Sequence, residues 1–469
     1  MTFLLVVCIM LGACYGTYRY LTSTGYVAAL AQSFRELFRD ALNAAQNPEL
    51  PPATPTPAPV QPGEEPQTPP QTPSGPGYDE EGTLVDPDEA LYALLYNAAQ
   101  SFTEEVDIAH LGYTSATLEP EVARFFFTHP DLFYVDNGYS VYTSGESSTI
   151  KKIRLRYLTT QDVAQTQLAY YNGVLDEVVG GIPAGATDFE TVLYLHDYLV
   201  QNYAYDYEGL ALEQATGESL AVRDAYNFFY GKKGVCQAYM LAMIALCEEA
   251  GISCLPVTSD AMAHAWNLVE LDGEWYHVDV TWDDAGGEQS AVYPSYVSYQ
   301  YFLLSGEALY HTGRTAQWLT SETANASTYD AALWRAATTP LCKNGEDYFC
   351  VVYDAVSGAP TIFRGTPVAM TAVQTIDAKW FSGPSTYYRQ SWASIVAWED
   401  VMLISTATGF LYYDRETNAL STAAELGTVL DGKQIFGVCG VSADGTLTYV
   451  AAVDYKGSFT ELTWKIPTT

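Results

Sequence analysis

Basic residues are scarce in this 469-residue chain. Its 21 Lys and Arg residues are outnumbered by 56 Asp and Glu residues, which leaves a formal net charge of −35 at pH 7. A surface with this balance repels phosphate groups and anionic lipid headgroups, so we expect no nucleic-acid partner and no binding to anionic membrane surfaces. The charge bears on solubility and partners, and it says nothing about chemistry.

Long apolar runs are also lacking. The run over residues 3–13 has the length of a signal peptide and is short for a membrane-spanning helix. Cys14 completes the sequence LGAC, which resembles a lipoprotein cleavage box with Cys14 as the lipidated residue. We therefore expect residues 1–46 to contain a signal or membrane anchor and an amphipathic stalk. No Lys or Arg precedes the run, so a lipoprotein signal, an uncleaved anchor and an ordinary cleaved signal all stay open.

Residues 47–83 lack the apolar content of a core. Most of this stretch reads PELPPATPTPAPVQPGEEPQTPPQTPSGPG, which is rich in Pro, Thr and Gln. Such a composition favours an extended, semi-rigid disordered linker. An anchor, a spacer and then a globular region is the layout of a protein tethered to a surface. We therefore expect an extracytoplasmic protein that is anchored to the membrane through its N-terminus.

Cysteine is sparse, with eight residues in the whole chain, of which six lie beyond residue 14. Cys342 and Cys350 flank KNGEDYF, a spacing that allows a cross-strand disulfide outside the cytoplasm, with free buried thiols as the alternative. Cys247 and Cys254 lie in apolar runs and are expected to be small core residues.

Cys236 opens a predicted helix. Residues 236–250 contain no Pro or Gly, and Gly251 follows where a left-handed C-terminal cap is favoured. Cys236 therefore lies in the first turn, beside unpaired backbone N–H groups and the positive end of the helix dipole. This setting favours the thiolate, which is the nucleophilic form of cysteine.

A predicted β-hairpin follows this helix. Residues 264–271 and 274–281 are strand-like, and they are joined by an Asp-Gly pair at 272–273 that favours a two-residue turn. A tight turn makes His264 and Asp279 diagonal neighbours on one face, with backbones roughly 7–8 Å apart. An imidazole and a carboxylate can bridge that distance, whereas a register shift of one residue would separate them.

Cys236, His264 and Asp279 supply the thiol, the base and the orienting carboxylate of a Cys-His-Asp triad. Their motifs, GVCQAY, HAWNLVELDG and EWYHVDVTWDD, occur in the order typical of the bacterial transglutaminase-like superfamily, relatives of papain-type cysteine peptidases, and this chain resembles that superfamily. LHDYLVQNYAYD, HPDLFYV and SYQYFLLSGEALYH extend the resemblance to roughly residues 88–314. It implies an α+β fold with a transglutaminase-like, papain-like core and a helical N-terminal lead-in, and it requires no cofactor.

The resemblance also implies a reaction. Cys236 attacks a carboxamide or peptide carbonyl, its own backbone N–H stabilises the oxyanion, and His264 protonates the leaving amine. Water or an amine then releases the thioacyl group, so peptidase, deamidase and cross-linking transferase activities all stay open. The expected substrates are peptides or proteins, with cell-wall peptide as one candidate. The alternative is a catalytically idle binding or scaffold protein at the cell surface.

Three further residues are predicted near the triad. Trp266 lies two positions after His264 and is expected to shield the ion pair from water. Gln237 and Tyr239 follow the nucleophile and are expected on the substrate side. The superfamily resemblance implies an acidic residue and a glycine where this chain has Gln237-Ala238, which leaves the substrate pocket undefined.

Two other groupings of titratable residues have simpler interpretations. His264, His277 and Asp279 share one strand face and could ligate a metal, but the spacing supplies no further soft ligand, so no metal is expected. His196 and Asp197 lie on a predicted helix. The simplest interpretation is that they form hydrogen bonds inside the fold.

We expect residues 84–330 to form the catalytic domain, and residues 331–469 to form a C-terminal all-β domain. Three segments beginning at Glu346, Glu399 and Asp444 each consist of a strand, a Gly-containing turn and a second strand. This spacing favours blade-like repeats or a small sandwich, which would serve as a binding or packing module. The predicted elements of the N-terminal half are helices over 88–99, 119–127 (capped by Thr117), 162–179 and 188–203, and a hairpin over 141–157.

Overall fold

The computed structural model describes most of the chain from Asp88 onward. The predicted anchor and stalk (1–46), Cys14 and the linker (47–83) lie outside the described residues. Within the described part of the chain, no helix is both long enough and apolar enough to cross a bilayer. The described residues are 88–143, 148–216, 221–284, 297–312, 318–337, 339–353, 359–388, 391–455 and 457–467.

The N-terminal part is a helix pair with a small antiparallel sheet of strand order β1-β3-β2. The prediction that Thr117 caps the second helix, α5, is wrong. Thr114 is the N-cap, and Thr117 is the third helical residue, which forms a capping box with Thr114. Leu95, Phe125 and Ile153 belong to its core. The elements are α4 (Glu89–Gln100), β1 (Glu105–Asp107), η1 (Ala109–Leu111), α5 (Ser115–Thr128), η2 (Pro130–Leu132), β2 (Ser140–Thr143) and β3 (Ile150–Arg154).

The part of the chain from Gln161 to Glu249 is mainly helical. The predicted helix at 188–203 is observed as α7, which begins with a capping box between Thr187 and Glu190. A two-strand parallel pair, β4 and β5, precedes the helix that carries Cys236. The elements are α6 (Gln161–Gly180), α7 (Asp188–Asn202), β4 (Ala204–Tyr205), α8 (Tyr207–Thr216), α9 (Ala225–Gly231), β5 (Lys233–Gly234) and α10 (Cys236–Glu249).

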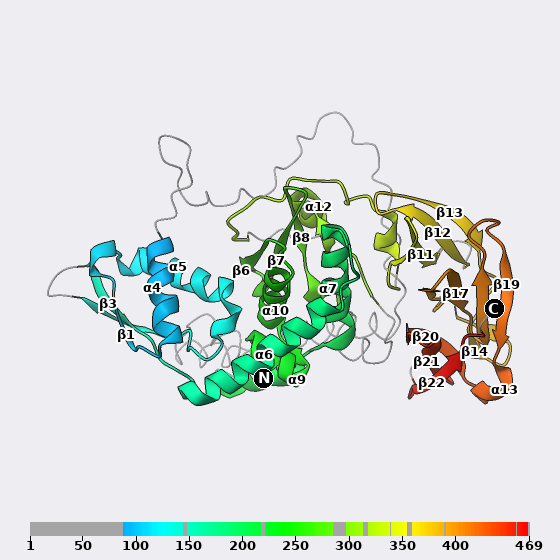
Figure 1. Cartoon of the computed structure of the whole chain (residues 1–469), viewed down its shortest axis with the longest axis horizontal. Helices are drawn as coiled ribbons and strands as arrows, with labels where there is room; N and C mark the ends of the chain where they lie inside the picture. The colour runs from blue at the N-terminus through cyan, green and yellow to red at the C-terminus, as the bar shows by residue number, and fades with distance from the viewer. Residues whose placement is uncertain are drawn as a thin grey trace, which may run out of the picture. The chain divides into compact units, whose positions relative to one another are not determined.

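Helix α10 lies at the centre of the main core. Eleven of its 14 residues are buried, so it is apolar around its whole circumference rather than amphipathic. It contacts strands β6 and β7 as well as helices α6, α7 and α9 (Figure 1). The sheet beside it has the order β6-β7-β8-β9. The elements are β6 (Cys254–Ser259), β7 (His264–Leu271), β8 (Glu274–Val278), α11 (Val280–Asp283), β9 (Phe302–Leu304) and α12 (Gly306–His311).

The predicted hairpin register is confirmed, since Leu271 pairs with Glu274 across the β7–β8 turn. Asp272 and Gly273 have φ values of 54° and 81°, the left-handed conformations that a two-residue hairpin turn requires. The predicted second strand is too long. It ends at Val278 because the Asp279 carboxylate caps α11 instead of continuing the strand.

The C-terminal region consists of antiparallel sheets whose strands follow one another in sequence order. Two four-stranded sheets, β10–β13 and β16–β19, each place a predicted strand pair at their centre, and the third predicted pair forms β21 and β22 of a three-stranded sheet. The elements are η3 (Leu333–Ala336), β10 (Cys342–Asn344), β11 (Asp347–Tyr353), β12 (Pro360–Thr366), β13 (Ala369–Thr375), β14 (Phe381–Gly383), β15 (Thr386–Tyr387), β16 (Ile395–Trp398), β17 (Val401–Ser405), β18 (Gly409–Tyr413), β19 (Leu420–Glu425), α13 (Gly427–Leu430), β20 (Gln434–Val441), β21 (Thr446–Ala452) and β22 (Thr460–Lys465).

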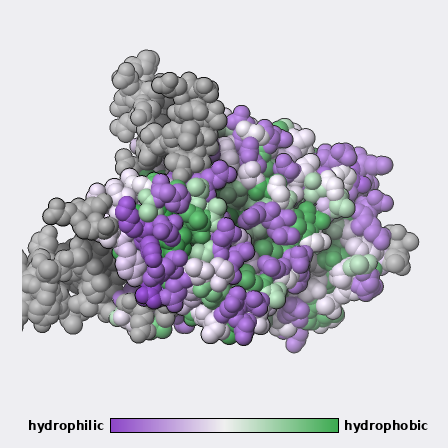
Figure 2. Space-filling view, turned by 60° about the vertical axis from the view of Figure 1, so that its left-hand side comes forward, coloured by the Kyte–Doolittle hydropathy of each residue, from purple (hydrophilic) through white to green (hydrophobic). Residues whose placement is uncertain are grey.

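One core cluster of this region joins different sheets through Phe349, Ile395 and Phe436. Cys342 and Cys350 are both free thiols, because Cys342 lies opposite Phe349 and not opposite Cys350. The alternative of free thiols therefore holds at these two positions. On the face drawn in Figure 2, hydrophilic residues are interspersed with smaller apolar patches.

Candidate active site

Cys236 is the first residue of α10, as predicted, and only 8% of it is exposed. The chain before it must approach the helix closely. A Cβ at Gly234 would lie 2.8 Å from side-chain atoms of both Ala238 and Phe228. A larger residue at this position would therefore push the backbone before α10 away from the helix. The position at the helix start places first-turn backbone N–H groups and the positive end of the dipole beside the sulfur.

His264 and Asp279 meet as the hairpin predicts. The His264 Nε2 atom lies 2.7 Å from the Asp279 Oδ2 atom, and the Asp279 side chain is fully buried. Two further bonds fix the aspartate, because its Oδ1 accepts the Trp282 N–H at 3.1 Å and its own N–H donates to the Tyr301 carbonyl at 3.0 Å. The carboxylate can therefore hold one orientation of the imidazole ring.

The surroundings of His264 favour its charged form. Burial opposes a charge on the ring and lowers the pKa of His264. The Asp279 carboxylate outweighs this effect, and Cys236 adds to the opposing shift, so the pKa of His264 is raised to about 9. Cys236 is thus one of the groups that favour the charged form of the histidine bonded to Asp279. An imidazolium at neutral pH is the partner that stabilises a neighbouring thiolate.

Two tryptophans cover the His264 ring. Trp266 is 2% exposed and stacks on it with ring centroids 5.5 Å apart, where the sequence predicts a shielding residue. Trp282 is 46% exposed and packs against the same ring at 5.4 Å. One buried and one solvent-exposed indole therefore pack against the His264 ring, and shielding of the ion pair by Trp266 stays a prediction.

The two residues predicted on the substrate side differ in exposure. Gln237 is half-buried in the first turn of α10. Tyr239 is 1% exposed, and its hydroxyl donates to the Asp284 carboxylate. Their roles toward a substrate stay predictions. Burial and, next, the charge of Cys236 raise the pKa of Tyr205 to about 12.

The alternative of a metal site finds no support in the described residues, where no group of three or more His, Cys, Asp or Glu side chains is placed to hold a metal ion. His277 is buried and its Nδ1 accepts the Trp266 indole N–H at 3.1 Å. This bond occupies one of the two ring nitrogens that a metal would use.

The simple interpretation of His196 and Asp197 is confirmed, because both form hydrogen bonds within the fold. The His196 Nδ1 atom lies 3.0 Å from Asp197 and its Nε2 atom lies 3.3 Å from Asp283. Sequence reasoning missed the contact of Trp282 with His264 and the contact of His196 with Asp283. The sequence did contain a signal for Trp282. It follows Asp279 by three residues, and this is the spacing at which an N-cap carboxylate accepts a backbone N–H.

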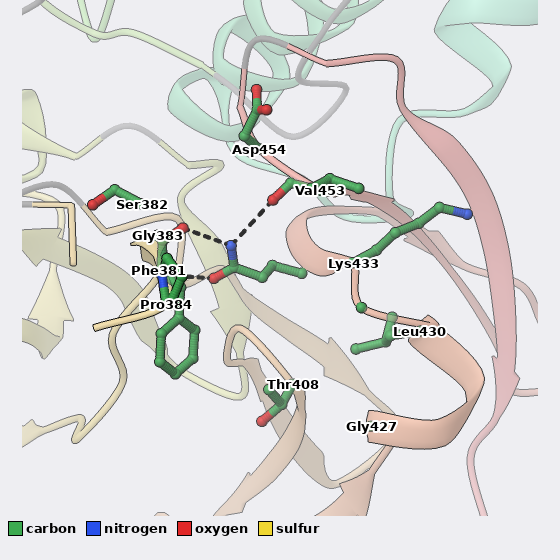
Figure 3. Close-up of a pocket in the computed structure, with 12 residues that line it drawn as sticks. Phe381, Ser382, Gly383, Pro384, Thr408, Gly427, Leu430, Lys433, Val453 and Asp454 are labelled. Carbon is green, nitrogen blue, oxygen red and sulfur yellow. Dashed lines mark hydrogen bonds between the residues drawn. The ribbon is translucent and has the colours of Figure 1, made fainter. Parts of the chain in front are cut away.

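A separate hollow of about 480 Å³ lies in the C-terminal region (Figure 3). Its lining includes Phe381, Lys433 and Asp454 but no Cys or His. The buried Gln434 amide at its wall is already bound, since its nitrogen donates to the Phe381 carbonyl at 2.8 Å and its oxygen accepts the Phe381 N–H at 2.6 Å. This hollow contains none of the three residues of the predicted triad.

A thiol at a helix start, beside an imidazole that a buried carboxylate orients, defines the class of papain-like cysteine enzymes. The comparison with known families agrees with this class. Residues 176–280 match the model of the transglutaminase-like superfamily, and this range includes Cys236, His264 and Asp279. The chain therefore contains a transglutaminase-like core of helices and strands, followed by a region of several antiparallel sheets.

Individual relatives are distant. Kyphoscoliosis peptidase of Mus musculus is 22% identical over 170 residues, which cover 33% of this chain and 25% of the peptidase, so the match spans about a quarter of that relative. Among solved structures, a TGase is 15% identical with a TM-score of 0.21 and covers 32% of this chain and 45% of its own. A candidate cysteine protease of Cytophaga hutchinsonii is 15% identical with a TM-score of 0.19, over 31% of this chain and 63% of that one.

Proposed function

We propose that this protein is a thiol enzyme that cleaves or transfers amide bonds of peptides or proteins, with Cys236 as nucleophile, His264 as acid and base, and Asp279 as the orienting residue. The observation that carries the proposal is the buried His264–Asp279 pair, 2.7 Å apart, together with the Cys236 thiol at the start of α10, which adds to the raised pKa of His264. Each group has the chemistry that its proposed step requires.

The proposed reaction has two half-reactions. The Cys236 thiolate adds to the carbonyl carbon, and the developing oxyanion accepts the Cys236 backbone N–H at the helix start. The tetrahedral intermediate collapses as the C–N bond breaks, and the His264 imidazolium gives its proton to the leaving amine. His264, now neutral, removes a proton from water or from an acceptor amine, which attacks the thioester. The C–S bond then breaks, which releases the acid or the new amide and regenerates the Cys236 thiolate and the His264 imidazolium.

The indole contacts give the two tryptophans a role in this scheme. Excluding water from the His264–Asp279 pair strengthens their attraction, because the local dielectric falls. Trp266 does so from the buried side, and Trp282 from the solvent side, where an incoming substrate would also touch it. Gln237, in the same first turn as Cys236, is the proposed neighbour of the substrate on the helix.

Selective alkylation tests the proposal. Full-length protein is treated with limiting iodoacetamide at pH 6, and each cysteine peptide is quantified by mass spectrometry. Cys236 is expected to react well ahead of Cys247 and Cys439, and His264→Ala is expected to remove that advantage. Equal rates at Cys236 and Cys439 in the wild type would contradict the proposal.

Product analysis separates the two outcomes of the second half-reaction. Peptide, glutamine-donor and cell-wall-peptide libraries are incubated with and without a primary amine, and Cys236→Ala is the control. Release of free acid alone indicates hydrolysis, whereas incorporation of the amine indicates transfer. If neither product forms in any library while Cys236 remains unreactive, the alternative of an idle binding protein is the better account.

The proposed location rests on the sequence alone. We propose that the enzyme is extracytoplasmic and is attached to the membrane through residues 1–46, with Cys14 as the candidate lipidation site and residues 47–83 as the spacer. Its proposed partners are therefore peptides or proteins outside the cytoplasm.

A further inference from the structure

A second histidine lies buried in the core and takes no part in the proposed reaction. His196, on α7, has no solvent exposure, and its two ring nitrogens face Asp197 at 3.0 Å and Asp283 at 3.3 Å. The Tyr299 hydroxyl donates to the other oxygen of Asp197 at 2.8 Å. A buried imidazole between two carboxylates is a costly arrangement for mere packing, because every member has to be desolvated.

Asp283 connects this group to the site. Its carboxylate oxygens lie 3.0 and 3.1 Å from the Tyr301 N–H, and one of them accepts the Ser298 hydroxyl at 3.0 Å. The Tyr301 carbonyl in turn accepts the Asp279 N–H at 3.0 Å, and the Asp283 N–H donates to the Asp279 carbonyl at 3.1 Å. The Asp283 carboxylate is thus linked to the Asp279 N–H through Tyr301, and the Asp283 backbone N–H bonds the Asp279 carbonyl directly.

The charges explain why a histidine is needed there. Asp279 and Asp283 are both fully buried within one turn of chain, and two neighbouring carboxylates repel each other. Burial raises the pKa of Asp283, the His196 charge opposes this shift, and the Asp279 charge adds to it. Arg335 is the other cation that faces Asp283, and burial lowers the pKa of its guanidinium to about 10.

We propose that Asp283, paired with His196, is a positioning residue that fixes the Asp279 carboxylate toward His264 through the backbone N–H and carbonyl of Tyr301. This inference rests on the proposed function, since it assigns a second histidine–aspartate pair to the same site. It predicts that weakening Asp283 lets Asp279 move, so that the His264 cation loses stabilisation. The Cys236 thiolate, which that cation stabilises, then forms only at higher pH.

The test follows the pH dependence of Cys236 alkylation. Wild type, Asp283→Asn and Ser298→Ala are compared as full-length chains between pH 4 and 9, with folding checked by circular dichroism. Asp283→Asn keeps the shape of the side chain and loses its charge, and it is expected to raise the alkylation midpoint by about one pH unit, a tenfold change in the ionisation equilibrium. Ser298→Ala removes one bond to Asp283 and is expected to give a smaller shift in the same direction.

Asp224→Asn is the matched control. Asp224 is a partly buried carboxylate that accepts the Asn227 N–H at 2.8 Å and its side-chain amide at 2.9 Å, in the cap of α9. It is expected to leave the midpoint unchanged. A purely structural role of Asp283 would lower the folded fraction and the amplitude without moving the midpoint.

Unshifted midpoints in folded Asp283→Asn and Ser298→Ala would overturn the positioning role. If Asp283→Asn does not fold, Ser298→Ala alone decides, and an unshifted midpoint there overturns the proposal. The readout needs no amide substrate. A shifted midpoint without amide turnover in the wild type would support the positioning role and contradict the proposed enzyme, so the two failures are distinguishable.

Discussion

At the scale of residues, the proposed site depends on how Cys236, His264 and Asp279 affect one another's charge. His264 would carry little charge at pH 8 with its ordinary pKa, and it is the Asp279 carboxylate and Cys236 that raise this value to about 9 against burial. Asp279 is in turn oriented by the Trp282 N–H and the Tyr301 carbonyl. We therefore expect reactivity at the sulfur to depend on residues that do not touch it.

Trp282→Ala provides a prediction at this scale. Removing the exposed indole admits water to the His264–Asp279 pair, which weakens their attraction because the local dielectric rises. We expect the reaction of Cys236 with a disulfide reagent at pH 5 to slow by about tenfold, which corresponds to roughly 1.4 kcal/mol. Trp275→Ala, a partly buried tryptophan on the neighbouring strand β8, is the control, and an equal slowing in both variants would contradict the shielding role.

At the scale of elements, the helix and the hairpin were accessible from sequence because their signals are local. Residues 236–250 show no helix breaker, and the turn at 272–273 sets the register. The end of β8 was predicted three residues too far, because alternation continues through Thr281 while the Asp279 side chain caps a new helix. The His196–Asp283 contact joins residues 87 apart in sequence, and no periodicity signals such a contact.

The hairpin turn leads to a stability prediction. Gly273 has φ of 81°, so Gly273→Ala forces a side chain into the left-handed region and is expected to destabilise the protein by about 1–2 kcal/mol. Gly173 lies inside α6 with nothing within 4 Å of an added Cβ, so Gly173→Ala is expected to stabilise by about 0.5–1 kcal/mol. Urea denaturation measures both changes, and effects of the same sign would be inconsistent with the observed turn.

The contact between α7 and α11 makes stability depend on pH. The two carboxylates beside His196 raise its pKa from 6.5 to about 9, although burial opposes the shift. A histidine pKa that rises on folding adds stability that is complete below pH 6.5 and is lost as the pH rises through about 9. We expect this histidine to account for roughly 3 kcal/mol of lost stability over that range. Denaturation curves at pH 6 and pH 9 should show a smaller difference in His196→Gln than in the wild type, and equal differences would refute this assignment.

At the scale of the whole molecule, the chemistry is confined to one part of the chain. The superfamily match covers residues 176–280, while the C-terminal sheets beyond Cys342 contain no residue of the proposed triad. The formal charge of −35 disfavours anionic partners for the whole chain. A tether formed by residues 1–83 would keep such a protein close to a membrane without surface adsorption.

The tether itself gives a prediction. The full-length chain expressed in bacteria is expected in the membrane fraction, and a chain that lacks residues 1–83 is expected in the soluble fraction. Metabolic labelling with palmitate identifies the anchor type, because Cys14→Ala abolishes the label only if Cys14 is lipidated. Full-length protein in the soluble fraction would contradict a membrane anchor of either type.

The most direct test of the central claim, that Cys236, His264 and Asp279 act as one unit, is the titration of the His264 ring by nitrogen-15 NMR. The signal is assigned by its loss in His264→Gln. In the wild type the ring is expected to titrate near pH 9, and both Asp279→Asn and Cys236→Ala are expected to lower that pKa. A wild-type ring that titrates near pH 6.5, unchanged in both variants, would contradict the account.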